Sequence, residues 1–227
     1  MRVIFMLLFT LALSFNSGLK AQDLSKSRVA IVGLTGGINE DILNGLDPRN
    51  ITNTPYTNEE KDLQARVNKR MEKLFLDDVY DILQKRLEEK GIQLEPLSTS
   101  DKVASLNEMG YPNPLIPKNV IKKKNEDYAD YFLNINIVCS KPILGGLLGF
   151  KPESRMRIVL YDGTGKKLKT INDEAKDSSP VKNTDFDEEW TVGIERFNRM
   201  DWYSVMQLEE RLLSIVDAAI TNAVGQL

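Results

Sequence analysis

The stretch ADYFLNINIVC, residues 129–139, decides the fold class. Apolar side chains occupy every second position of this stretch, whereas Asn134 and Asn136 fall between them. Alternation with a period of two is typical of a β-strand that is buried on one face only. We therefore predict a strand whose apolar face packs against helices and is formed by Tyr131, Leu133, Ile135, Ile137 and Cys139.

Further strands are predicted on both sides of this one. The run RVAIVGL at 28–34 is almost continuously apolar, which is typical of a strand buried on both faces. Residues 155–161 and 166–171 are predicted to pair as a hairpin around the turn DGTG at 162–165. Residues 92–97 are predicted to form an edge strand, because Pro96 cannot donate a backbone hydrogen bond.

Two long helices are predicted to cover the sheet. The capping box TNEE at 57–60 opens a helix that ends at Gly91, a residue suited to a left-handed cap. A second helix closes the chain, and shorter ones are predicted within 100–110 and 118–125. The apolar residues of the two long helices recur at steps of three and four: Leu63, Val67, Met71, Leu74, Phe75, Ile82, Leu83 and Leu87 in the first, and Val205, Leu208, Leu212, Ile215, Val216, Ala219 and Ile220 in the second.

These elements predict a single α+β domain over residues 22–227. Its sheet is mixed but mostly antiparallel, and the long amphipathic helix and the C-terminal helix pack against it. The glycines of GLTGG at 33–37 are expected to form a turn, because their spacing fits neither a dinucleotide-binding nor a P-loop motif. Residues 35–56 are expected to be largely irregular, and residues 172–189 to be a solvated connection.

Residues 1–21 have the parts of a cleavable signal peptide. Arg2 is followed by the uncharged, largely apolar run VIFMLLFTLALSF at 3–15 and then by a short polar stretch that reaches Ala21. This run is shorter than the roughly 20 residues that a membrane-spanning helix needs. We therefore expect cleavage near Ala21, no transmembrane helix in the processed chain and a periplasmic or secreted location.

The composition argues against several classes of function. The chain contains no histidine, which excludes Ser-His-Asp catalysis and histidine-ligated zinc, and Cys139 is its single cysteine. The formal charge is −3, and loss of Arg2 and Lys20 with the signal peptide would make it −5, so nucleic acid is not an expected partner. We expect no cofactor and no metal, and consider catalysis less favoured than binding.

The segment PILGGLLGF at 142–150 is the leading candidate for a binding site. It is uncharged and glycine-rich and links two predicted strands. One interpretation is a loop folded over the core, and the other is an exposed tip that docks on a partner or a membrane interface. The side chains that would make this contact are Ile143, Leu144, Leu147, Leu148 and Phe150.

Two alternatives remain open. An acidic cluster beside Trp190 could supply a carboxylate pair to an exported hydrolase that acts on glycans, although a solvated acidic loop is the simpler interpretation. The chain could also carry an apolar ligand between the sheet and its long helix. The carboxylates of the cluster are Asp185, Asp187, Glu188 and Glu189.

The order of elements resembles a group of bacterial envelope proteins. The group includes the curli-secretion lipoproteins, the lipoprotein activators of penicillin-binding proteins and the amino-terminal domain of the Tol-system translocation protein. The similar pieces are residues 28–34, the helix to Gly91, YADYFLNINI at 128–137, RIVLYDGTGKKL at 157–168 and the closing helix. This chain differs in lacking a cysteine for lipid attachment near residue 21. The resemblance implies a non-catalytic module that docks on another envelope protein.

Overall fold

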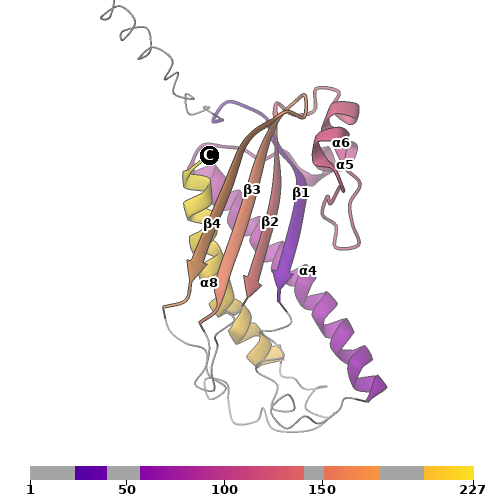
Figure 1. Ribbon diagram of the computed structural model, residues 1–227, viewed down its shortest axis with the longest axis vertical. Coiled ribbons are helices and arrows are strands. Elements are labelled where there is room, and N and C mark those ends of the chain that lie inside the picture. The colour runs from indigo at the N-terminus through magenta and orange to yellow at the C-terminus, as the bar shows by residue number, and fades with distance from the viewer. Residues whose placement is uncertain (1–23, 40–56, 141–150, 179–201) are drawn as a thin grey trace, which may run out of the picture.

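A four-stranded sheet with the order β1-β2-β3-β4 forms the centre of the molecule (Figure 1). The computed structural model describes residues 24–39, 57–140, 151–178 and 202–227. The strands are β1 (Val29–Ile38), β2 (Tyr131–Ser140), β3 (Glu153–Asp162) and β4 (Lys167–Lys176). β1 pairs with β2 in parallel, and the other two pairings are antiparallel. The predicted α+β class with a mixed, mostly antiparallel sheet is therefore confirmed.

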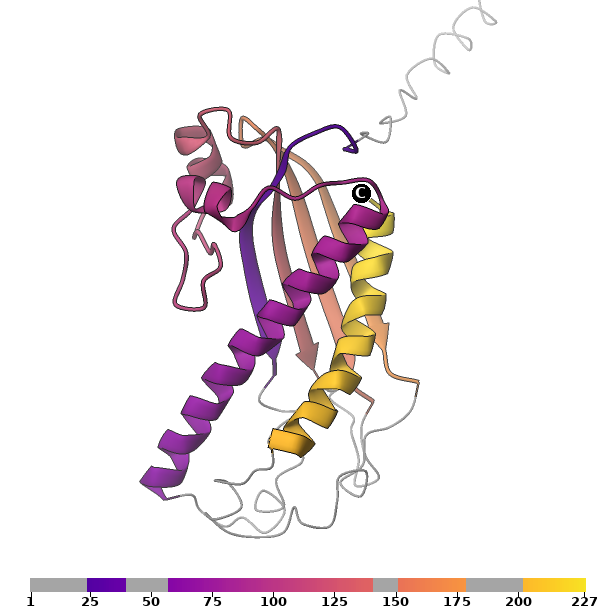
Figure 2. The same ribbon diagram turned by 180° about the vertical axis from the view of Figure 1, so that it is seen from behind.

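The two long helices lie on the same face of the sheet (Figure 2). They are α4 (Asn58–Glu89) and α8 (Trp202–Gly225), and they contact each other as well as the sheet. The alternating face predicted for β2 is buried against them, since Leu133, Ile135, Ile137 and Cys139 are fully inaccessible to solvent. The helix side of this core includes Phe75, Leu76, Val79, Leu83, Leu87, Leu212, Val216, Ala219 and Ile220.

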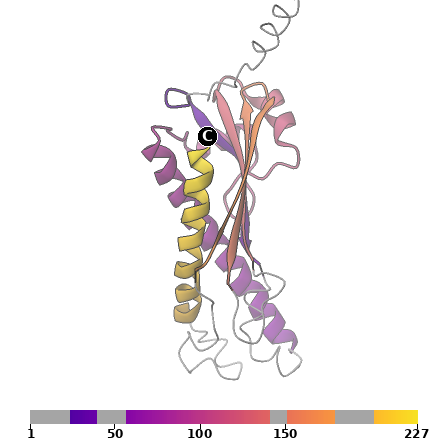
Figure 3. The same cartoon turned by 60° about the vertical axis from the view of Figure 1, so that its left-hand side comes forward.

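Two short helices cover one end of the opposite face (Figure 3). They are α5 (Leu97–Val103) and α6 (Pro117–Lys124), and both contact β1. A second, smaller core lies beneath them, with the side chains of Ala30, Val32, Val103, Ala104, Ile121, Ala129 and Phe132 buried together. We call residues 97–126 the α5–α6 lobe.

Three expectations about local structure were wrong. The glycines at 33–37 form no turn, because β1 continues through them to Ile38. β4 extends to Lys176, so residues 172–176 belong to the sheet and not to a solvated connection. Residues 92–97 contribute only a single bridge between Leu94 and Val29 in place of a strand. In the first two cases backbone pairing with a neighbouring strand, which leaves no mark in local composition, decides the conformation.

Gly36 shows why β1 needs its glycines. Its φ is +147°, and a Cβ built there would lie 1.7 Å from the carbonyl oxygen of Ile137 on β2. At Gly33, where the pairing register shifts, a Cβ would lie 2.1 Å from the side-chain oxygen of Asn134. β1 can therefore approach β2 this closely only without a side chain at Gly36, whereas a side chain at Gly33 would require Asn134 to move.

The ends of the predicted helices are mostly where the sequence places them. α4 stops at Glu89, and Gly91 adopts a φ of +75°, as expected for a left-handed cap. The helix predicted within 100–110 lies earlier, at Leu97–Val103. Among the described residues, no helix is both long and apolar enough to cross a membrane.

Candidate functional site

The residues singled out as candidate sites lie outside the described part of the chain. This holds for the apolar segment, Ile143, Leu144, Leu147, Leu148 and Phe150, and for the acidic cluster, Asp185, Asp187, Glu188 and Glu189. The structure shows instead the framework from which these segments leave. That framework is the end of the sheet at which β1, β2 and β4 finish, which we call the loop end.

The loop end is defined by a row of four paired residues. Ile38 pairs with Cys139, Cys139 with Ser154, and Ser154 with Ala175, so β1, β2 and β4 end side by side where β3 begins. Both α4 and α8 also begin at this end of the molecule (Figures 1 and 2). The connections 40–56, 141–150 and 179–201 are therefore all attached to the same end of the domain.

A buried carboxylate lies at the loop end of the sheet. The side chain of Glu153 is only 4% exposed and is 2.5 Å from the Arg155 guanidinium and 3.6 Å from the Lys176 ammonium. Glu174 on β4 pairs with the same two cations, at 3.8 Å and 3.2 Å. The four side chains form a neutral network across β3 and β4, which compensates the cost of burying Glu153.

A second ion pair ties α8 to the same region. The guanidinium of Arg211 donates to the Asp177 carboxylate at 2.6 Å, and only 11% of the Asp177 side chain is exposed. The Lys151 ammonium donates to the carbonyl oxygen of Ser178 at 2.9 Å, joining the residues just before β3 to those just after β4. These contacts fix the ends of the strands from which the connections leave.

The carboxylates and the cysteine near this end of the sheet are paired or buried within the fold. The Glu153, Glu174 and Asp177 carboxylates are each neutralised by a cation, and no cluster of acidic or cysteine side chains suited to a metal ion occurs within the described ranges. Cys139 is fully buried, and burial raises the pKa of its thiol to about 12. The interpretation of this cysteine as a core residue is confirmed, because a reactive thiol needs a depressed pKa and exposure.

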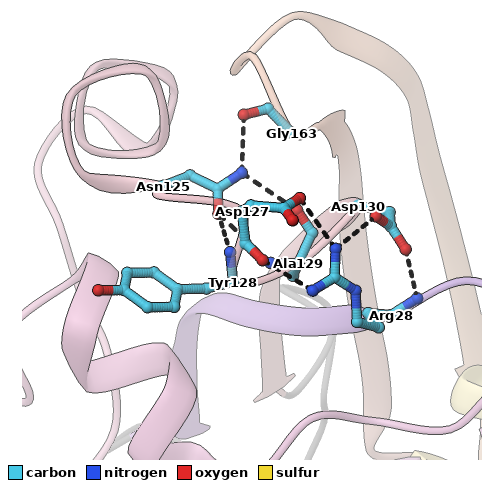
Figure 4. A network of polar contacts seen from close by, with 7 residues as sticks. All are labelled: Arg28, Asn125, Asp127, Tyr128, Ala129, Asp130 and Gly163. Carbon is cyan, nitrogen blue, oxygen red and sulfur yellow. Dashed lines mark hydrogen bonds and ion pairs between the residues drawn. The ribbon is translucent and has the colours of Figure 1, made fainter.

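The motifs that carry the family resemblance meet at the opposite end of the sheet (Figure 4). The backbone N–H of Arg28 donates to one carboxylate oxygen of Asp130 at 2.8 Å, and its guanidinium donates to the other at 3.0 Å. The same guanidinium also donates to the carbonyl and carboxylate oxygens of Asp127, at 2.7 Å and 3.0 Å. The hydrogen bonds from Arg28 hold the pKa of Asp130 below its usual range.

Asn125 links this network to the turn between β3 and β4. Its side-chain amide donates to the carbonyl oxygens of Ala129 at 3.1 Å and Gly163 at 2.9 Å, and its side-chain oxygen accepts from the N–H groups of Tyr128 and Ala129. The motifs at 129–133 and 162–166 thus join β2, β3 and α6. Their contacts are structural, since Asn125, Asp130 and Asp162 each bond to groups within the fold.

One exposed apolar feature escaped the sequence reading. Leu115 and Ile116 precede α6, and they are 97% and 46% exposed. The signal that could have found them is the pair of flanking prolines, Pro114 and Pro117, which exclude these residues from a regular helix or strand.

No protein-family model matches the chain, and a search of curated proteins found no match. Solved structures to which it is similar include the lipoprotein GNA1162 from Neisseria meningitidis, at 13% identity and a TM-score of 0.30, covering 80% of this chain and 96% of that one. Another is the hypothetical protein CT253 from Chlamydia trachomatis, at 12% identity and a TM-score of 0.33, covering 86% and 98%. At these values neither likeness assigns a family or a function to this chain.

Proposed function

We propose that this chain is an exported, non-catalytic binding module that docks on a protein of a bacterial cell-envelope assembly. The apolar segment at 142–150 makes the contact, and the segment at 40–56 contributes to it. Export follows from the signal-like residues 1–21, and the bacterial envelope from the resemblance carried by 128–137 and 157–168.

The observation that carries this proposal is the paired row Ile38, Cys139, Ser154 and Ala175. This row attaches three connections to one end of the sheet, and one of them contains the uncharged, largely apolar segment 142–150. Binding residues are frequently found on loops that a rigid scaffold positions at one end. The paired charges at the loop end suit such a scaffold, because they hold the strand ends without offering a free nucleophile.

The test is affinity capture of the tagged, exported protein from crosslinked native envelopes, read by mass spectrometry. Leu147→Asp combined with Leu148→Asp places two charges in the apolar segment, and we expect it to abolish recovery of a reproducible envelope protein. The matched control is Leu74→Asp, which makes the same type of change at an exposed position on α4, outside the segment 142–150.

The thermal unfolding midpoint decides whether a loss of capture is meaningful. Under this proposal we expect the double variant to unfold within about 2 °C of the unmodified protein, because a contact surface is exposed in the free protein and exposed substitutions change stability little. Capture that survives in the folded double variant rules out 142–150 as the contact. A reproducible partner lost equally with Leu74→Asp would also count against the proposal.

A further inference from the structure

The α5–α6 lobe combines an exposed apolar tip with an uncompensated basic helix. α6 has the sequence PKNVIKKK and contains four lysines and no acidic residue. The whole lobe contains five lysines and three acidic residues, a formal charge of +2, in a chain whose total is −3. The remainder of the chain is therefore −5, since −3 minus +2 gives −5, so positive charge is concentrated in the lobe.

The lysines of α6 have no carboxylate partners in the described part of the chain. None of Lys118, Lys122, Lys123 and Lys124 takes part in an ion pair there. Of the acidic residues that follow α6, Asp127 and Asp130 both pair with Arg28, and Glu126 accepts a hydrogen bond from the Tyr128 hydroxyl at 3.3 Å. The positive charge of α6 is thus left available to an external anion.

The apolar tip is held in place by the fold. The carbonyl oxygen of Pro112 accepts a hydrogen bond from the N–H of Leu34 on β1 at 2.8 Å. The hydroxyl of Tyr111 donates to Asp77 on α4 at 2.7 Å, and Lys69 on α4 pairs with Glu108. Beyond this anchor, prolines at 114 and 117 restrict the backbone on either side of Leu115 and Ile116. Because the backbone around Leu115 and Ile116 is already restricted, burying their side chains in a partner costs little additional conformational entropy.

We infer that the α5–α6 lobe docks on an anionic phospholipid surface, with Leu115 and Ile116 entering the interfacial region and the α6 lysines contacting the headgroups. Apolar side chains beside clustered lysines are the combination that binds at such an interface. A soluble polyanion would be attracted by the lysines alone and would leave a 97%-exposed leucine without a role. This inference goes beyond the docking proposed above and uses different residues.

The test is flotation of the exported protein with vesicles of phosphatidylcholine containing about 30 mol% phosphatidylglycerol, compared with phosphatidylcholine alone. We expect binding to the anionic vesicles only, and we expect it to weaken as salt rises from about 50 mM to about 500 mM. All variants carry the same residues before Leu24, so differences between them report the folded domain.

Three variants separate the contributions. Leu115→Asp is expected to lower the partition coefficient at least about tenfold, because a buried leucine side chain is lost and a negative charge is introduced. Lys122→Gln with Lys123→Gln is expected to lower it about 25-fold, at about fivefold for each lysine. The control Lys61→Glu with Leu74→Asp changes exposed residues of α4 and should bind as the unmodified protein does.

Several outcomes would overturn the inference. One is the absence of binding to anionic vesicles at low salt, and another is equal binding by all variants. Loss of binding in the lysine variant with normal binding by Leu115→Asp would indicate a site for a soluble polyanion, which binding to dextran sulfate would then show directly. Because envelope capture through 142–150 is measured separately, failure of either proposal leaves the other intact.

Discussion

Arg86 on α4 and Asp217 on α8 form a two-point ion pair that joins the long helices. Nε of Arg86 donates to one carboxylate oxygen at 2.7 Å, and a terminal guanidinium nitrogen lies 2.5 Å from the other. Asp217 is about one-third exposed, so the contact lies at the rim of the main core. The hydrogen bonds from Arg86 hold the pKa of the Asp217 carboxyl below its usual range.

We expect Asp217→Asn to lower the thermal unfolding midpoint by a few degrees at pH 7, because the charge and one acceptor are lost. The control is Glu89→Gln, since Glu89 bonds the same arginine at 2.8 Å but has a half-exposed side chain and should matter less. Circular dichroism of the three proteins measures the difference. A larger effect of Glu89→Gln would contradict this account.

The same pair predicts a pH dependence. The pKa of Asp217 is lower in the folded than in the unfolded protein, where it is about 4. The stabilisation is therefore complete above about pH 4 and is lost as the pH falls through the folded pKa. In urea unfolding, the difference in unfolding free energy between the unmodified protein and Asp217→Asn should be constant from pH 7 to about pH 5 and should decrease below about pH 4. A difference in unfolding free energy that grows on acidification would contradict a lowered pKa of Asp217 in the folded protein.

The sequence predicts those parts of the fold that depend on periodicity. The alternation at 131–139 and the three- and four-residue steps of the two helices follow directly from which faces are buried. Residues 172–176 were missed because they are polar and are held by pairing with β3, which local hydrophobicity does not report. The continuation of β1 through Gly36 was missed for a related reason, since it depends on how closely β2 approaches.

The candidate site was only partly predictable. The apolar segment 142–150 could be found by its composition, but that its flanking strands end in one row depends on the register. The prolines that flank Leu115 and Ile116 exclude a regular element there but do not report exposure, which depends on the anchoring of Pro112 on Leu34. Contacts between residues distant in the chain decide both features.

The contrast between Gly36 and Gly37 tests the packing of β1 on β2. We expect Gly36→Ala to prevent folding or to lower the unfolding midpoint severely, because its Cβ would lie 1.7 Å from the Ile137 carbonyl oxygen. Gly37→Ala makes the same change one residue later, where the new Cβ would meet only the side chain of Glu72 at 3.7 Å. It should be tolerated or slightly stabilising. Equal tolerance of both variants would show that β1 is not placed as described.

Asn125 provides a graded test of the network at the β3–β4 turn. We expect Asn125→Ala to destabilise the protein by about 1–3 kcal/mol, because partly buried carbonyl and N–H groups lose their partners. Asn125→Asp keeps the acceptor for the N–H groups of Tyr128 and Ala129 but loses the donor to Gly163. Chemical denaturation should therefore rank both variants below the unmodified protein. Full stability of Asn125→Ala would show that the turn is held by other contacts.

The single cysteine tests the strand register. Cys139 faces the main core with a pKa raised to about 12, so at pH 8 its thiol is buried and protonated. We expect a thiol reagent to modify it only as fast as the domain opens, whereas denatured protein should react at once. The matched variant Cys139→Ala with Val138→Cys moves the thiol one residue, to the partly exposed opposite face of β2, and should react rapidly in the folded state. Rapid native-state reaction of the unmodified protein would place Cys139 on the wrong face. The pairing of Cys139 with Ile38 and Ser154, which defines the loop end, would then also be wrong.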